Sequence, residues 1–362
     1  MIGFSQFWPK GGMPGILHHY TETLVTFEYA SPNAHQPHSI LFIGGLSDGL
    51  ATTSYTHDII KTLETTEWSF FTLNLSSSYS AWGLGHLDRD TDEIAHCIRY
   101  IKSYKAAKYG SGTTHADAKV VLMGHSSGSQ DVLHYLYRPN PHRNRPVFDP
   151  ELVHLERPVI DGAILQAPVS DRDAFAWVLH EGFLGRSPEE LRQTYDTLVS
   201  MAREIVAQND RYDVVLPIEL CSQFSFVSPV SARRFLSLAS PDSPGSPSEE
   251  DLFSADLSDE EYAKTFGKIQ ERGLLRGRLM VAPGGKDQTV PDWVDKDALL
   301  AKWRRITDHD EKYQVWDQEN SGIVPGASHA LSDDDQAEPR RFLADRVLNF
   351  LQSAAGRSDR SC

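Results

Sequence analysis

Residues 124–128, with the sequence Gly-His-Ser-Ser-Gly, constrain the fold of this chain more than any other feature. They follow an apolar run, residues 119–123, that is typical of a buried strand, and they precede a helical segment, residues 129–136. A turn this tight needs glycine on both sides of Ser126, because larger side chains would collide with the strand and the helix. The turn exposes the Ser126 hydroxyl at a helix N-terminus, where free N–H groups favour developing negative charge. The segment therefore predicts a strained turn that presents a nucleophilic serine.

The rest of the chain alternates short apolar strands with amphipathic helices, which predicts a doubly wound, mostly parallel sheet. We expect one or two antiparallel edge strands within residues 16–29, and further strands at 39–43, 68–75, 119–123, 159–165 and 278–281, with strand-like segments at 313–316 and 321–324. We expect helices at 54–63, 88–104, 129–136, 291–303 and 334–351. Together with the serine turn, this order predicts the α/β-hydrolase fold with a helical cap insertion.

Residues 171–276 break the strand–helix alternation and predict the cap, which leaves residues 1–170 and 277–362 as the hydrolase core. Within the cap, Ser187 and Glu190 form a capping-box pattern that opens a helix. Residues 138–158, rich in proline and arginine, form a second insertion to which the sequence assigns no chemistry.

Composition restricts the partners and the location of the protein. The net charge of −15 argues against nucleic acid, which requires a basic footprint, and disfavours anionic membrane surfaces. The sequence has no run of 18 apolar residues and no secretory signal pattern. Its three cysteines, Cys97, Cys221 and Cys362, do not form a disulfide framework and suit a reducing compartment. The expected location is therefore the cytoplasm. The sequence has no H-E-x-x-H, C-x-x-C or Walker motif, so we expect neither a bound metal nor a cofactor.

A serine hydroxyl needs a histidine to accept its proton and a carboxylate to orient that histidine. In the order Ser–acid–His, Asp287 follows the strand at 278–281, and His329 lies in a loop after the last strand-like segment. Asp287 could instead be a turn residue, and His329 a surface-loop histidine. Asp171, just after the sixth strand, is a rival for the acid. We expect Ser126, Asp287 and His329 to be the catalytic residues.

An oxyanion hole needs two backbone N–H groups. We expect Ser127, directly after the nucleophile, to supply one of them. We expect Leu46 to supply the other; it follows a Gly-Gly pair, which could also be a plain turn. Asp48 lies near this loop and could either hold a substrate cation or cap a turn. His86 is a candidate substrate contact, although a solvated loop residue is the simpler interpretation. His125 has the wrong geometry for the base, because adjacent side chains on a tight turn point apart.

Several of these segments together resemble a fungal α/β-hydrolase family first catalogued as a domain of unknown function, which includes intracellular siderophore esterases of the SidJ type. The resemblance rests on residues 42–49, 87–90, 124–131 and 325–329. It implies hydrolysis of ester bonds in fusarinine-type siderophores, with Ser126, Asp287 and His329 as the triad. The partner implied is a small-molecule ester. If that ester is a ferric siderophore, the iron arrives as part of the substrate.

Other functions remain open from the residues alone. An acyl-enzyme on the same triad would serve a carboxylesterase, a thioesterase or an acyltransferase with another substrate. A non-catalytic binding protein on a hydrolase fold is an alternative of a different class.

Overall fold

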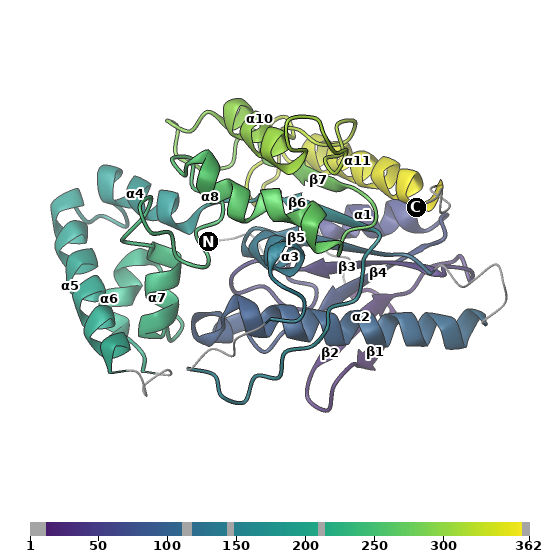
Figure 1. Ribbon diagram of the computed structural model, residues 1–362, viewed down its shortest axis with the longest axis horizontal. Coiled ribbons are helices and arrows are strands. Elements are labelled where there is room, and N and C mark those ends of the chain that lie inside the picture. The colour runs from purple at the N-terminus through teal and green to yellow at the C-terminus, as the bar shows by residue number, and fades with distance from the viewer. Residues whose placement is uncertain (1–11, 111–117, 143–147, 209–213, 357–362) are drawn as a thin grey trace.

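The computed structural model describes residues 12–110, 118–142, 148–208 and 214–356 (Figure 1). The strands are β1 (Gly15–His19), β2 (Val25–Tyr29), β3 (His38–Ile43), β4 (Trp68–Leu73), β5 (Val120–His125), β6 (Gly162–Gln166) and β7 (Leu279–Ala282). The helices are α1 (Thr56–Leu63), α2 (Leu87–Tyr109), α3 (Ser127–Tyr137), α4 (Asp171–Glu181), α5 (Pro188–Ala207), α6 (Ile218–Cys221), α7 (Ala232–Ala239), α8 (Asp259–Lys264), α9 (Ile269–Arg272), α10 (Lys296–Thr307) and α11 (Ala337–Gly356). Short 3-10 turns are η1 (Tyr79–Leu84), η2 (Ser222–Phe224) and η3 (Phe266–Lys268).

The seven strands form one sheet in the order β1-β2-β4-β3-β5-β6-β7. The pairs from β4 through β7 are parallel, and β1 and β2 are added antiparallel at one edge. This confirms the predicted mostly parallel sheet, and of the one or two antiparallel edge strands expected, two are present. Because β3 and β5 are neighbours, with Ile43 opposite Gly124, the loop after β3 lies beside the Gly-x-Ser-x-Gly turn after β5.

Both faces of the sheet are covered by helices, so the central strands are apolar throughout. Along β3, Leu41 and Ile43 belong to the apolar cluster that includes α2, α3, α8 and α10, while Ile40 and Phe42 belong to the cluster with α1 and α11. Successive side chains of a strand point to opposite faces, which gives this division. Figure 1 shows α2 on one side of the sheet and α11 on the other.

The predicted cap, residues 171–276, packs in two parts. Helices α4 to α7 form an apolar cluster of their own around Phe235, and they stand together at one end of the molecule (Figure 1, left). The later residues Phe253, Tyr262 and Phe266 instead join the cluster on the sheet. The separate helical layer is therefore shorter than the predicted segment, because its last third packs on α3 and α10.

Two sequence predictions at the C-terminal end differ from the structure. Residues 313–316 and 321–324 pair with β7 and the loop after it only through single bridges, at Trp316 and Val324. The helix predicted from residue 291 begins at Lys296, because the Asp295 side chain accepts a hydrogen bond from the Ala298 N–H and caps it there.

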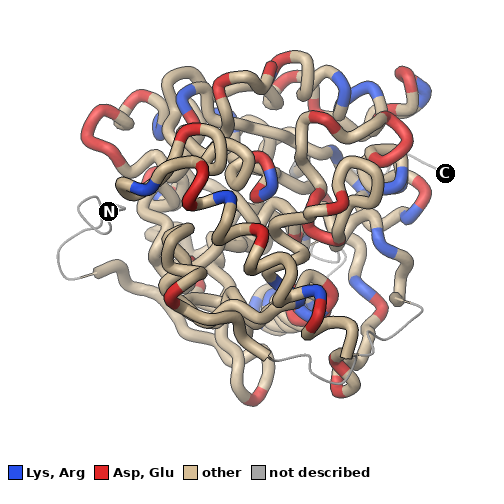
Figure 2. The backbone as a smooth tube through the Cα atoms, turned by 90° about the vertical axis from the view of Figure 1, so that its left-hand side faces the viewer, with Lys and Arg blue, Asp and Glu red and all other residues tan. Residues whose placement is uncertain are grey.

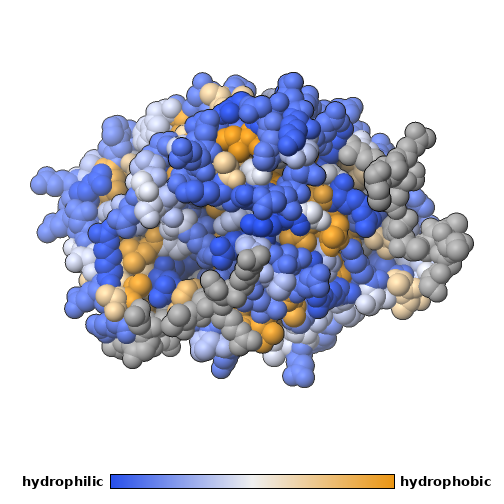
Figure 3. Space-filling view, in the orientation of Figure 1, coloured by the Kyte–Doolittle hydropathy of each residue, from blue (hydrophilic) through white to orange (hydrophobic). Residues whose placement is uncertain are grey.

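Charged side chains are spread over the surface. Figure 2 shows acidic and basic residues interspersed at the end of the molecule that carries the cap helices. Figure 3 shows a mainly hydrophilic face on which hydrophobic areas are small and separated. Within the part of the chain that the structure describes, each helix is too short or too polar to cross a membrane.

Candidate active site

The turn between β5 and α3 has the strain that the sequence predicts. Ser126 adopts φ 55° and ψ −123°, a conformation that residues with side chains rarely take. A Cβ on Gly124 would lie 2.1 Å from the Gly128 carbonyl oxygen, and a Cβ on Gly128 would lie 2.4 Å from that of Ile43. The Ser126 N–H donates to the Gln166 carbonyl at 3.0 Å, which anchors the turn to β6. Only glycine fits on either side of this serine.

Three side chains far apart in sequence form a hydrogen-bonded line. Ser126 Oγ lies 2.9 Å from His329 Nε2, and His329 Nδ1 lies 2.8 Å from Asp287 Oδ2. Each residue follows a strand, a strand-like segment or a turn at the carboxyl edge of the sheet. The fold thus brings all three predicted catalytic residues together.

Hydrogen bonds keep the Asp287 carboxylate ionised and aimed at the imidazole. The Thr289 N–H and hydroxyl both donate to Asp287 Oδ1, at 3.0 and 2.6 Å. Burial raises the pKa of Asp287. The charge and hydrogen bond of His329, together with the Thr289 donors, lower it by more, so the net pKa lies below its usual value. Thr289 is not identified from the sequence, although an aspartate commonly accepts from the backbone N–H two residues further on in such a turn.

The His329 imidazole is tuned in the opposite direction. Burial lowers its pKa, but the charge and hydrogen bond of Asp287 raise it by more, so the net pKa lies above 6.5. A second imidazole, His125, lies with its ring centre 5.1 Å from that of His329. Burial, followed by repulsion from His329, lowers the pKa of His125. Its Nδ1 faces Gln166 Oε1 at 2.5 Å, away from the serine–histidine line.

The rival acid Asp171 has a different partner. Its Oδ2 accepts a hydrogen bond from Gln130 Nε2 at 2.9 Å, at the start of α4. Asp171 lines the same cavity as Ser126, but the carboxylate in contact with His329 Nδ1 is Asp287. The geometry favours Asp287 for the acid.

The loop after β3 lies against the nucleophile. A Cβ on Gly45 would lie 2.8 Å from Ser126 Cβ and 3.3 Å from its Oγ, so the backbone of this loop approaches the serine closely. Leu46 follows directly and lines the cavity that holds Ser126 and His329. Ser127 is the first residue of α3, so its N–H has no acceptor within the helix. These positions fit two N–H donors beside the Ser126 hydroxyl.

Asp48 forms hydrogen bonds within this loop. Its Oδ2 accepts the Gly45 N–H at 2.9 Å and its Oδ1 accepts the Thr52 hydroxyl at 2.7 Å. The carboxylate also lines the cavity of about 250 Å³ around Ser126. The turn-capping alternative therefore describes its contacts, and they hold the Gly45–Leu46 backbone in place.

His86 lies elsewhere. It is buried at the N-cap of α2, where Nδ1 accepts the Arg89 N–H and Nε2 lies 2.8 Å from Asp149 Oδ2. It lines a separate cavity of about 470 Å³ beside Phe148 and α7. The structure does not bring His86 to the Ser126 cavity, and the solvated-loop interpretation is also wrong. The sequence prediction missed that a histidine can cap a helix and pair with a distant aspartate.

Comparisons with known proteins show which family the chain resembles. A family model described as a protein of unknown function (DUF1749) matches residues 9–352. The chain is 62% identical over 352 residues to the fusarinine C esterase sidJ of Aspergillus fumigatus, covering 97% of this chain and 99% of that protein. It is 46% identical to the esterase AN6793 of Emericella nidulans, covering 98% of this chain and 96% of the relative.

Solved structures give the same assignment. The siderophore hydrolase EstB from Aspergillus fumigatus superposes with a TM-score of 0.87 at 59% identity, over 97% of this chain and 100% of that one. A soluble variant of the monoglyceride lipase from Saccharomyces cerevisiae, at 13% identity and a TM-score of 0.54, shares the fold over 94% of this chain and 96% of its own. The chain therefore belongs to the DUF1749 family and is a carboxylic ester hydrolase with the α/β-hydrolase fold.

Proposed function

We propose that Ser126, His329 and Asp287 are the catalytic triad of a serine esterase. The observation that carries this proposal is the line of two hydrogen bonds, 2.9 and 2.8 Å long, that joins the three side chains. The line leads from a half-buried hydroxyl that lines the cavity to a buried carboxylate, which is the arrangement that nucleophilic serine chemistry requires.

In the first half of the reaction, Ser126 Oγ attacks the ester carbonyl carbon while His329 Nε2 takes the hydroxyl proton. The carbonyl oxygen becomes an oxyanion, which accepts hydrogen bonds from the Leu46 and Ser127 N–H groups. Loss of one such donor costs about 3 kcal/mol of transition-state stabilisation in serine hydrolases. The intermediate collapses when the bond to the leaving alkoxide breaks and His329 gives that oxygen its proton.

In the second half, water attacks the acyl-Ser126 ester. His329 removes a proton from the water and returns one to Ser126 Oγ, and the free acid leaves. Asp287 keeps the imidazole in the tautomer whose Nε2 faces the serine and stabilises the imidazolium in both halves. All steps use groups of this chain and water.

The substrate we propose is a fusarinine-type hydroxamate siderophore, with iron entering as part of the substrate. This rests on the relatives whose printed names give fusarinine C esterase and siderophore hydrolase, at 62% and 59% identity. The helices α4 to α7 are proposed as the cap over this substrate, since Ala174 of α4 lines the Ser126 cavity. The cytoplasmic location stays a prediction.

The triad is tested with Ser126→Ala, which removes the nucleophile. We expect hydrolysis of fusarinine C and of a simple chromogenic ester to fall by roughly 10⁶-fold in kcat. Ser200→Ala, an exposed serine on α5, is the matched control and should retain wild-type turnover. Wild-type turnover by Ser126→Ala would remove the triad assignment.

The substrate is tested separately by incubating the purified protein with ferric and iron-free fusarinine C and following linear products by mass spectrometry. No cleavage, alongside rapid turnover of simple esters, would end the siderophore proposal and keep the esterase. Addition of an alcohol or amine acceptor distinguishes hydrolysis from acyl transfer, because a transferase would yield the acceptor ester or amide. Turnover of neither ester class would favour a binding protein.

A further inference from the structure

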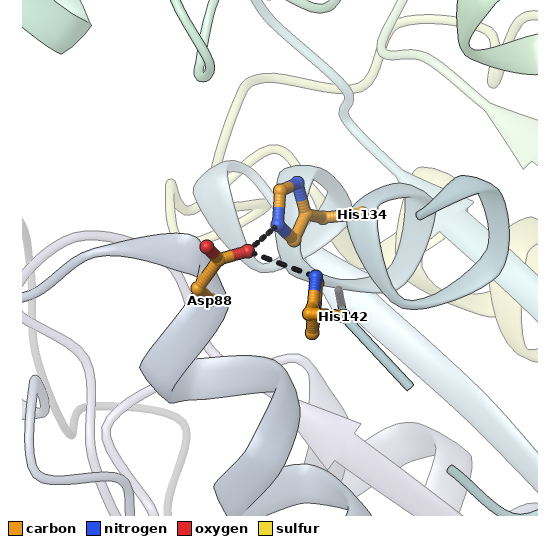
Figure 4. Close-up of side chains that lie close together, drawn as sticks. All are labelled: Asp88, His134 and His142. Carbon is orange, nitrogen blue, oxygen red and sulfur yellow. Dashed lines mark hydrogen bonds and ion pairs between the residues drawn. The ribbon is translucent and has the colours of Figure 1, made fainter. Parts of the chain in front are cut away.

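Outside the Ser126 cavity, a buried cluster of histidine and aspartate joins three segments of the chain (Figure 4). Asp88 lies in the first turn of α2, His134 lies on α3, and His142 lies in the insertion after α3. One ligand atom from each residue lies within 4.8 Å of the others, and all three residues are buried. The proline- and arginine-rich insertion thus supplies an imidazole to a site between two core helices.

The Asp88 carboxylate faces both imidazoles. Asp88 Oδ1 is hydrogen-bonded to His134 Nε2 at 2.8 Å, and it lies 3.3 Å from His142 Nδ1, which matches the spacing of metal ligands. A tetrahedral zinc ion with bonds near 2 Å separates its ligand atoms by about 3.3 Å. His142 Nδ1 is fully buried and makes no well-formed hydrogen bond to any described residue. Figure 4 shows that this nitrogen and the His134 imidazole both point at the Asp88 carboxylate.

The three side chains offer two imidazole nitrogens and one carboxylate oxygen to the centre of the cluster. Two imidazoles and a carboxylate suit a first-row transition metal better than magnesium or calcium.

A fourth ligand and a counter-charge lie at the edge of the cluster. Glu249 Oε1 lies 3.7 Å from His134 Nε2, and Glu249 also lines the cavity of about 470 Å³, which gives an ion a route in. Arg138 Nη2 lies 3.5 Å from Asp88 Oδ1 and 3.8 Å from Glu249 Oε1. Its side chain is 33% exposed, so it can turn towards solvent when a cation takes its place between the carboxylates.

We propose that Asp88, His134 and His142, with Glu249 or water in the fourth position, bind a structural zinc ion. The ion ties α2, α3 and the insertion together. The site stands apart from the chemistry, since His134 lies on α3 eight residues beyond Ser126, about 12 Å along the helix. Zinc therefore raises the stability of the fold and leaves the ester hydrolysis step to the triad.

The test uses the full chain, stripped of metal with a chelator that is then removed. Titration with ZnCl₂, followed by calorimetry and by metal analysis after gel filtration, should give one zinc per chain. Saturation at about 100 times the dissociation constant should raise the melting temperature by roughly 3–4 °C. Cobalt(II) should bind in the same ratio with the visible absorption of a four-coordinate site.

Variants assign the ligands. Asp88→Asn, His134→Gln and His142→Gln should each weaken zinc binding by more than roughly 10²-fold. His154→Gln, which alters the neighbouring His154–Asp92 pair 3.0 Å apart, and His180→Gln on the surface of α4 are matched controls that should bind like wild type. Arg138→Gln should bind zinc more tightly, a gain that a folding defect cannot imitate.

Three outcomes would overturn the proposal. The first is that the stripped wild-type chain binds less than about a tenth of an equivalent of zinc. The second is that the three ligand variants bind zinc as wild type does. The third is that His154→Gln loses zinc binding while His134→Gln binds zinc normally. Hydrolysis by the metal-free chain is measured in parallel, so that failure of the zinc site and failure of the esterase proposal are separate results.

Discussion

Asp287 acts on the imidazole through one hydrogen bond, to His329 Nδ1, so replacing one atom of its carboxylate tests its role. Asp287→Asn removes the charge next to His329 Nδ1 and favours the wrong imidazole tautomer, and kcat should fall about 10⁴-fold. Asp287 also outweighs the effect of burial on the pKa of His329, which must be neutral to accept the serine proton. The residual activity of Asp287→Asn should therefore rise with pH at a lower midpoint than that of wild type, measured as kcat/KM from pH 4.5 to 9.

Asp171→Asn is the control for this variant, because Asp171 also lines the Ser126 cavity and an asparagine there can still accept from Gln130. It should keep activity within a few-fold of wild type, and its midpoint should fall by less than that of Asp287→Asn, because the Asp171 charge raises the pKa of His329 by less than the Asp287 charge does. A larger loss in Asp171→Asn than in Asp287→Asn would transfer the acid role to Asp171.

The closeness of Gly45 to the nucleophile gives a second test at the residue scale. In Gly45→Ala the new Cβ would lie 2.8 Å from Ser126 Cβ, so the loop that carries the Leu46 N–H must move away. A displacement of about 1 Å at an oxyanion donor costs roughly 10²-fold in kcat. We expect that loss in kcat, with little change in the melting temperature.

Gly245→Ala is the comparison variant, since its Cβ would meet only the Asp242 carbonyl oxygen at 3.7 Å. Its kcat should equal that of wild type. If Gly45→Ala were equally active, the loop after β3 would not supply an oxyanion donor.

At the scale of elements, the sequence predicts well those features that depend on neighbouring residues. The turn at Ser126 follows from a strand, two glycines and a helix that are adjacent in the chain, and the structure has that order. The full capping box at Ser187, in which Ser187 and Glu190 satisfy each other's N–H groups, is also present. Asp287 and His329 could be selected only because the fold imposes an order on the loops that carry them.

Features that depend on distant partners escape the sequence. The pairing of His86 with Asp149 spans 63 positions, and the cluster of Asp88, His134 and His142 matches no local spacing motif. The segment near Trp316 looks like a strand because it is apolar, yet it makes only a single bridge to Leu279. In each case the missing quantity is a tertiary contact, which local periodicity does not encode.

The cap helices hold together through their own aromatic core, so a cavity there should disturb the cap before the sheet. Phe235 of α7 is fully buried, with its ring centre 5.8 Å from that of Phe175 and 6.1 Å from that of Tyr195. Phe235→Ala should destabilise this layer by about 3–5 kcal/mol. We expect hydrogen exchange to speed up in α4, α5 and α7 while β3 and β5 stay protected.

Val227→Ala, at a side chain that is 78% exposed in the same layer, should change stability by less than about 0.5 kcal/mol. Uniform loss of protection across the sheet in Phe235→Ala would mean that the cap and the core unfold as one unit.

Across the whole molecule, the acidic excess continues into the interior. The net charge is −15, and Asp90, Glu93 and Asp131 are all buried between α2 and α3. Burial, followed by repulsion from Asp90, raises the pKa of Glu93 from 4.5 to about 7. A pKa that is higher in the folded than in the unfolded chain means that folding binds a proton between these two values. The free energy of unfolding should therefore fall as the pH rises from about 4.5 to 7.

Glu93→Gln removes this titration and keeps an oxygen for the Ser76 N–H, which donates to Glu93 Oε2 at 2.8 Å. The variant should match wild type near pH 4.5 and exceed it above pH 7 by at most about 3 kcal/mol, since each unit of pKa shift corresponds to 1.36 kcal/mol. Urea unfolding at pH 4.5, 6, 7 and 8.5 and constant ionic strength measures the difference. Glu189→Gln, exposed on α5, makes the same change in net charge, and its stability should run parallel to wild type. Both variants lower the overall charge repulsion equally. If the dependence of the free energy of unfolding on pH flattens in Glu93→Gln alone, the effect comes from the buried carboxyl. If the dependence is the same in both variants, it comes from the surface charge.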